Sequence, residues 1–177
     1  IESVSASHFM HGLQSKGRTA LNFRFRKYLA STALIVFLVD YATKAWALSS
    51  LDSTSRPFIG KLLQFKLAKN SGAAFSLASS GTIFLSGFAI AMVFVILYFG
   101  TKVFSKPWAI AMGLALGGVL GNLSDRIFRP PYRLQGEVID FLELPHWPIF
   151  NIADCAVVSA AILIGYLNLK NVPFKKS

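Results

Sequence analysis

The sequence predicts an integral membrane protein built as a bundle of four helices, with a small β-sheet at the membrane surface. Apolar residues make up 54% of the 177 residues and charged residues only 15%, whereas an average soluble domain carries roughly 25% charged residues. Uncharged runs recur at the length of about 20 residues that a helix needs to cross a bilayer. The 18 Lys and Arg residues, against 8 Asp and Glu, lie mostly between these runs. This distribution favours basic loops beside anionic lipid over a single patch that binds nucleic acid.

The first predicted span follows Arg24, Arg26 and Lys27, so a secretory signal peptide is a competing interpretation of it. Asp40 and Lys44 lie in its second half, and no clean small-residue cleavage site follows, which favours an uncleaved membrane anchor. The four spans are expected at about 28–48, 82–100, 107–125 and 149–169.

Two longer segments, Ser49–Gly81 and Arg126–Pro148, connect the spans at one end of the predicted bundle. In the first, apolar residues alternate with other side chains over Leu63–Leu67, as in a half-buried strand, and Asn70-Ser71-Gly72 then turns the chain. The second carries four prolines and Trp147, an aromatic suited to the level of the lipid headgroups. A small sheet on the membrane surface is therefore expected.

Basic residues orient the bundle. The N-terminal tail holds five, the loop after the second span two and the C-terminal end three, against four and three in the two longer loops. Because an even number of spans puts both termini on one side, the positive-inside rule places that side in the cytoplasm. Residues 1–20 lack apolar periodicity and are expected to be disordered or foreign to the fold. The predicted single domain covers 21–170, and 171–177 form a basic tail.

Acidic residues within a span cost roughly 2.5 to 3.5 kcal/mol on insertion scales, so they are candidates for function. Half of the eight acids lie in spans or at their ends: Asp40, Asp125, Asp140 and Asp154. Asp40 and Lys44 are spaced i, i+4 and can pair on one helix face. A self-neutralising ion pair near the headgroups and a role in a site both remain open.

Gly113, Gly117 and Gly121 form a stripe of small residues on the third span, which allows another helix to approach closely. Asn122, Asp125 and Arg126 follow it, with polar groups on a shared face near that contact. They are either a structural clamp at a helix end or ligand contacts.

Asp140 and Asp154 lie in the segments VIDF and FNIAD, the first just before the fourth span and the second at its start. Asn151 and Asp154 share a helix face, so the two carboxylates could meet near the outer end of the bundle. Two carboxylates within about 3 Å cannot both ionise, so one would hold a proton while the other activates water, and the pair would titrate as a unit. From spacing alone, catalysis, a metal or proton site and a structural polar pair all remain possible.

Five segments resemble, in order and spacing, the signature segments of the bacterial lipoprotein signal peptidase (signal peptidase II) family. They are DYATK (Asp40–Lys44), KNSGAAFS (Lys69–Ser76), GGVLGNLSDR (Gly117–Arg126), GEVIDF (Gly136–Phe141) and FNIAD (Phe150–Asp154). Each lies at a predicted membrane boundary, and the resemblance covers about residues 28–170.

The resemblance implies a four-helix aspartic endopeptidase of the bacterial cytoplasmic (inner) membrane. Such enzymes remove the signal peptides of prolipoproteins, cutting before a cysteine that already carries diacylglycerol. The family pattern makes Asp140 and Asp154 catalytic. It also implies an extracytoplasmic sheet that cradles substrate and a lid over Arg129–Pro148. Its substrate and inhibitor contacts are Asn70, Gly72, Asn122, Arg126 and Asn151, with Asp40, Lys44 and Asp125 as supporting polar residues.

The same resemblance implies no metal and no organic cofactor. The expected partners are a diacylglyceryl prolipoprotein, membrane lipid and globomycin-type peptide inhibitors, with no nucleic acid, and we expect a monomer. The sequence departs from the family pattern in two details. The loop RIFRPPYRLQ is longer than the family pattern suggests, and Cys155 occupies a position where the family commonly has a small hydroxyl residue.

Two other function classes remain as alternatives. A proton- or ion-coupled transporter could use Asp40, Asp125 and Asp154 as a relay, but it predicts acids near the middle of the bilayer rather than at span ends. A non-catalytic lipid or peptide receptor could share the same pocket.

Overall fold

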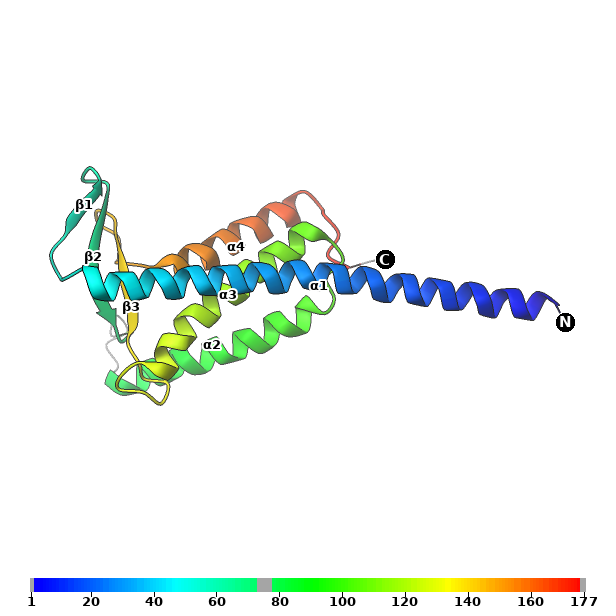
Figure 1. Ribbon diagram of the computed structural model, residues 1–177, viewed down its shortest axis with the longest axis horizontal. Coiled ribbons are helices and arrows are strands. Elements are labelled where there is room, and N and C mark those ends of the chain that lie inside the picture. The colour runs from blue at the N-terminus through cyan, green and yellow to red at the C-terminus, as the bar shows by residue number, and fades with distance from the viewer. Residues whose placement is uncertain (1, 73–77, 176–177) are drawn as a thin grey trace.

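The structure, a computed structural model, describes residues 2–72 and 78–175, with side chains over 25–72 and 81–175. Four helices form a bundle, and a three-stranded sheet lies at one end of them (Figure 1). All four helices are long and apolar enough to cross a membrane. The elements are α1 (Glu2–Ser50), β1 (Arg56–Ile59), β2 (Leu63–Asn70), α2 (Ala78–Gly100), α3 (Lys106–Phe128), β3 (Val138–Glu143) and α4 (Ile152–Leu169).

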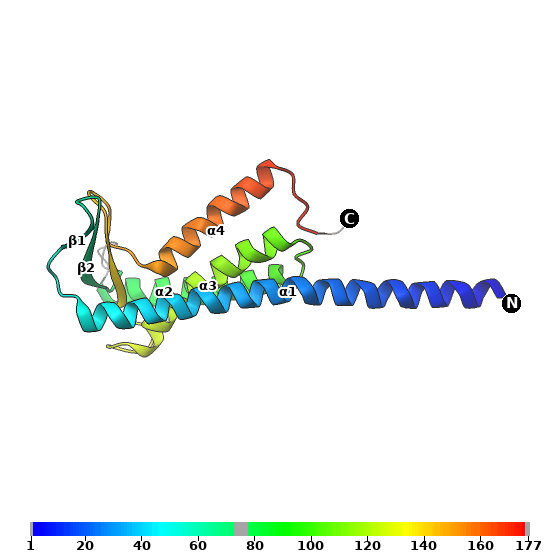
Figure 2. The same ribbon diagram turned by 45° about the horizontal axis from the view of Figure 1, so that its top comes forward.

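Helix α1 begins at Glu2, far before the predicted span, whose membrane-compatible part is Phe25–Ser50. Its N-terminal part projects beyond the other three helices (Figures 1 and 2). Residues 2–20 are helical, whereas the sequence led us to expect a disordered tail over residues 1–20. No proline occurs in the first 50 residues, so no proline interrupts the helix between Glu2 and the span.

The C-terminal segment folds back onto the bundle. The Trp108 indole Nε1–H donates to the carbonyl of Val172 at 2.9 Å, and the Phe174 ring packs against Trp108. The basic tail predicted from residue 171 is therefore attached to the bundle through at least Phe174, while residues 176–177 lie outside the described part.

Helix α3 is the central helix of the bundle and packs against α1, α2 and α4. Its predicted glycine stripe meets α1: a Cβ at Gly113 would lie 2.7 Å from the Leu29 carbonyl oxygen, and one at Gly117 2.7 Å from that of Ala33. Gly118, outside the stripe, gives α4 the same close approach, because a Cβ there would lie 2.5 Å from the Ala153 oxygen. The prediction that small residues on this span admit another helix is confirmed.

We expect Gly117→Leu to lower the yield of folded protein and its melting temperature in detergent. Leucine would collide with Val36 and the α1 backbone, and overpacking typically costs about 1–3 kcal/mol. The matched control is Gly87→Leu on α2, where a Cβ has no neighbour within 4 Å. Equal melting temperatures for the two variants would contradict this packing argument.

The sheet has the order β1-β2-β3, with antiparallel pairing throughout. The strand predicted around Leu63–Leu67 is confirmed as part of β2. The second long loop contains a strand that the sequence did not reveal, since β3 is buried on both faces and so shows no alternation. Asp140, expected in a loop, thus lies on β3, opposite Ala68 of β2.

Candidate active site

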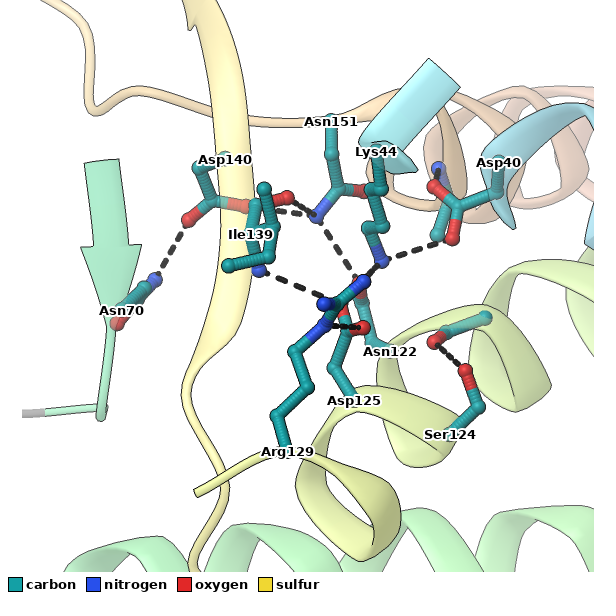
Figure 3. Close-up of polar contacts among 12 residues, drawn as sticks. Asp40, Lys44, Asn70, Asn122, Ser124, Asp125, Arg129, Ile139, Asp140 and Asn151 are labelled. Atoms are coloured by element: carbon teal, nitrogen blue, oxygen red, sulfur yellow. Dashed lines mark hydrogen bonds and ion pairs between the residues drawn. The ribbon is translucent and has the colours of Figure 1, made fainter. Parts of the chain in front are cut away.

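Asp140 is nearly inaccessible to solvent, at 2% exposure, and two side-chain amides hold its carboxylate. Asn70, the last residue of β2, donates to Oδ2 at 2.9 Å. Asn151, just before α4, donates to Oδ1 at 2.6 Å. Both contacts are drawn in Figure 3. The sheet and the fourth helix therefore fix this carboxylate together.

Asp154 lies in the first turn of α4 and takes part in a capping box with Asn151. The Asp154 N–H donates to the Asn151 side-chain oxygen at 3.0 Å, and the Asn151 N–H donates to Asp154 Oδ2 at 3.1 Å. Asn122 of α3 donates to the other oxygen, Oδ1, at 2.8 Å. The Asp154 carboxylate thus accepts two hydrogen bonds, one on each oxygen, at the N-terminus of α4.

Two asparagine side chains connect the two carboxylates. Asn151 Nδ2 donates to Asn122 Oδ1 at 3.0 Å as well as to Asp140, while Asn122 donates to Asp154. The expectation that Asn151 would share a face of the fourth span with Asp154 needs one correction, because Asn151 is the N-cap of α4 rather than part of its first turn. The structure thus brings Asp140, Asp154, Asn70, Asn122 and Asn151 together at the sheet end of the bundle.

Burial raises the pKa of the Asp140 carboxyl from its ordinary value to about 6. The negative charge of Asp154 acts in the same direction, whereas the hydrogen bonds from Asn70 and Asn151 oppose it. A raised pKa means that the folded protein holds this proton more tightly than the unfolded chain does. The folded state therefore loses stability as the pH rises through the window between about 4 and 6.

We expect Asp140→Asn to gain thermal stability relative to wild type as the pH is raised from 4 to 7, because asparagine has no proton to lose. The measurement is the difference in melting temperature between the two proteins at each pH. Glu143→Gln is the control: the Ser55 hydroxyl, and then Lys66, lower the pKa of Glu143, so its small effect has the opposite sign. A pH-independent difference for Asp140→Asn would count against the raised pKa.

Lys44 lies at the centre of a second, adjoining network. Its ammonium contacts Asp40 Oδ2 at 2.7 Å, Asp125 Oδ2 at 2.9 Å and Asn122 Oδ1 at 2.9 Å. Lys44 and Asp40 are each only 1% exposed, so the pair is buried inside the protein. Since Lys44 occupies the oxygen of Asn122, the amide nitrogen of Asn122 is the end that faces Asp154.

Each acid bound to Lys44 also holds a backbone segment of the site. Asp40 Oδ1 accepts from the N–H of Ala153, the neighbour of Asp154, at 2.9 Å. Asp125 accepts from the N–H of Ile139, the neighbour of Asp140, at 3.2 Å, and from the Arg129 guanidinium. Asp40 and Lys44 therefore combine the two interpretations that the sequence left open. They neutralise each other as an ion pair, and the pair also supports the site.

Arg126 is buried beside the turn after β2. No hydrogen-bond partner meets its Nη1 within the described residues, although the atom is inaccessible to solvent. Gly72 has φ +84°, and a Cβ there would lie 3.8 Å from Arg126 Nη2 and 2.6 Å from Leu85, so only glycine suits this turn. The rest of the segment Lys69–Ser76, residues 73–76, lies outside the described part of the chain.

A cavity of about 270 Å³ between α2, α3 and α4 reaches the site, with Asn122 and Asp154 in its lining and otherwise apolar walls, including Phe88 and Val157. A larger cavity of about 450 Å³ lies between α1 and α3, lined almost wholly by apolar side chains and away from the two carboxylates. Over the described residues, no three His, Cys, Asp or Glu side chains are grouped closely enough to hold a metal ion.

Two contributors were missed at the sequence level. Arg129 and the backbone of Ile139 both contact Asp125. The spacing Asp125 to Arg129 is i, i+4, the same signal that suggested the Asp40 and Lys44 pair, and could have revealed the first of them. No local pattern indicates the contact of the Ile139 N–H with Asp125, since that contact depends on where β3 passes α3.

Comparison with known proteins agrees with this geometry. Residues 32–170 match the family model described as "Signal peptidase (SPase) II". The lipoprotein signal peptidase of Mycobacterium avium is 41% identical over 84% of this chain and 82% of its own length. That of Streptomyces griseus is 41% identical over 83% of this chain and 76% of its own length.

A solved structure described as "Bacterial membrane enzyme structure by the in meso method at 1.9 A resolution" is similar in fold. It is 29% identical, covers 81% of this chain and 94% of its own, and superposes with a TM-score of 0.73. The chain therefore belongs to the signal peptidase II family, whose members are multi-pass membrane peptidases.

Proposed function

We propose that this protein is an aspartic endopeptidase that removes signal peptides from diacylglyceryl-modified prolipoproteins by cutting before the lipidated cysteine. The observation that carries the proposal is the pair of carboxylates, Asp140 from the sheet and Asp154 from α4, connected through Asn122 and Asn151. The family to which the chain belongs supports a peptidase that processes lipoproteins.

In the proposed reaction the two aspartates share one proton. Asp154, whose two oxygens each accept one hydrogen bond, serves as the base that takes a proton from water. The hydroxide equivalent attacks the scissile carbonyl carbon, and the carbon–nitrogen bond then breaks. Asp140, whose pKa is raised, supplies the proton that the leaving amine needs.

Substrate would reach the carboxylates from the lipid. The cavity between α2, α3 and α4 has apolar walls and ends at Asn122 and Asp154, so it fits an apolar segment or acyl chain of a membrane-held substrate. Arg126 Nη1, which has no hydrogen-bond partner among the described residues, offers a donor to a peptide carbonyl or developing oxyanion. Asn70, Gly72, Asn122 and Asn151 would complete the contacts. Residues 138–143 of the predicted lid form the buried strand β3, so the stretch before it, 129–137, would form the lid.

We further propose that both termini are cytoplasmic and that the sheet faces the outside. The termini lie at the end of the bundle opposite the sheet (Figure 1), in keeping with the basic flanks. A reporter that is active only outside the cytoplasm should stay inactive when fused after Phe174. The same reporter inserted after Ser53 should be active. The reverse pattern would overturn this topology.

The decisive test compares a diacylglyceryl prolipoprotein with the same protein lacking the lipid, each incubated with the purified enzyme. We expect cleavage of the lipidated form only, without added metal or cofactor, and inhibition by globomycin-type peptides. Binding of the lipidated form without cleavage would indicate the receptor alternative instead. The transporter alternative is not favoured, because the acids pair with donors at one end of the bundle rather than forming a relay across it.

A further inference from the structure

Four large apolar side chains are exposed at one end of the sheet, beyond the ends of the membrane helices. Phe58 and Ile59 end β1, Leu62 lies in the turn between β1 and β2, and the three are 59%, 56% and 65% exposed. Trp147, from the loop after β3, is 66% exposed. Gln64 at the start of β2 pairs with Glu143 at the end of β3, so the two segments lie at the same end of the sheet.

The turn that connects Phe58 and Ile59 to Leu62 is tight. The Leu62 N–H donates to the Ile59 carbonyl at 3.1 Å, and Gly60 takes the left-handed conformation that such a turn needs (φ +53°). Lys61, between Gly60 and Leu62, is exposed as well. The apolar side chains therefore surround one basic residue on a short, ordered turn.

The orientation of the sheet carries this turn away from the bundle axis. The strands run across the bundle axis, so the β1–β2 turn projects sideways from the bundle, on the side of α4 in both views (Figures 1 and 2). A series of aromatic contacts leads out to it. Trp46 of α1 contacts Phe65 at a centroid distance of 5.2 Å, and Phe65 contacts Phe58 at 4.7 Å. Tryptophan at the end of a spanning helix marks the headgroup level.

We propose that residues 58–62 and Trp147, here called the hairpin anchor, insert into the headgroup region of the lipid leaflet beside the sheet. Aliphatic and aromatic side chains next to a basic residue are the composition of segments that lie in a membrane interface. Lys61 would meet lipid phosphate while Phe58, Ile59, Leu62 and Trp147 leave water. The anchor would hold β2 and β3, and with them Asn70 and Asp140, at a fixed height over the bilayer.

The test measures where the turn lies without using catalysis. Leu62→Cys, in a Cys155→Ser background, is labelled with the fluorophore NBD and reconstituted in lipid nanodiscs. Ser53→Cys, an exposed position in the loop before β1, is the matched control. We expect the label at position 62 to emit at shorter wavelength, to lose quenching by aqueous iodide and to gain quenching by lipids that carry a nitroxide near the headgroup. The label at position 53 should show none of these changes.

A second variant tests whether the neighbouring side chains hold the turn in lipid. Adding Ile59→Ser and Trp147→Ser to the labelled protein should restore iodide quenching at position 62. Both side chains are exposed, so the core is not altered. If iodide quenches the labels at positions 62 and 53 equally in nanodiscs, the anchor does not exist. Shielding from iodide without quenching by nitroxide lipids would show a protein partner, and would equally overturn the proposal.

Discussion

Asp140→Asn and Asp154→Asn are each expected to abolish cleavage while leaving a folded protein that still binds substrate. Asparagine keeps the shape of the side chain and can still form hydrogen bonds, but it cannot take a proton from water or return one to the leaving amine. Loss of general acid–base catalysis costs typically 10²–10⁴ in rate. Turnover of lipidated prolipoprotein by purified enzyme is the measurement, with binding of the same substrate measured in parallel.

Two controls separate a catalytic role from support. Asp52→Asn removes an exposed carboxylate that pairs with Arg56, and should change turnover little. Asp40→Asn removes an acid that holds the Ala153 N–H, next to Asp154, and should cause a partial loss only. If either Asp140→Asn or Asp154→Asn kept more than about a tenth of wild-type turnover, the catalytic role of that aspartate would be wrong.

The double variant gives a further expectation. Because the two carboxylates would act as one unit, changing both should be no worse than changing either alone. Independent binding residues would instead show losses that multiply. Rates of the two single variants and the double variant, measured under one condition, decide between these outcomes.

Lys44→Met is expected to cause the largest loss of stability in the molecule. It leaves Asp40 and Asp125 buried without their shared cation, and breaking a buried ion pair from one side typically costs about 3–5 kcal/mol. It also removes one of the two donors to the Asn122 oxygen, which leaves only Asn151 to orient the amide that faces Asp154. The midpoint of unfolding in detergent is the measurement.

Lys66→Met is the matched control, because Lys66 is 34% exposed and pairs with Glu143 at 3.3 Å. Exposed pairs of this kind contribute about 0–1 kcal/mol, so this variant should unfold close to wild type. Combining Lys44→Met with Asp40→Asn removes one of the two stranded charges, and should be less destabilised than Lys44→Met alone. A Lys44→Met protein as stable as Lys66→Met would show that the buried charges do not depend on Lys44.

The alternation of apolar and other residues at Leu63–Leu67 and the turn at Asn70-Ser71-Gly72 were enough to predict a strand, although both faces of β2 are half-buried in the structure. The strand β3 could not be recognised in the same way. Its residues Val138–Phe141 are all buried, and a short apolar run is equally consistent with a loop or a helix end. Asp140 therefore appeared to lie in a loop, although β2 and α4 hold it on a strand.

The sequence by itself determined the four spans, the Asp40 and Lys44 pair, the close approach of another helix to the glycine stripe and the pair Asp140 and Asp154 as candidates. These depend on the length of apolar runs, on helical spacing and on the rarity of charge in a membrane, which are all local properties. Only the tertiary structure decided which partner each polar side chain takes. That Lys44 serves Asp125 and Asn122 as well as Asp40, and that Asn151 connects Asp140 to Asn122, depends on contacts between residues 11 to 81 positions apart. Sequence spacing within one element cannot encode such contacts, because they exist only once α1, α3, α4 and the sheet have packed together.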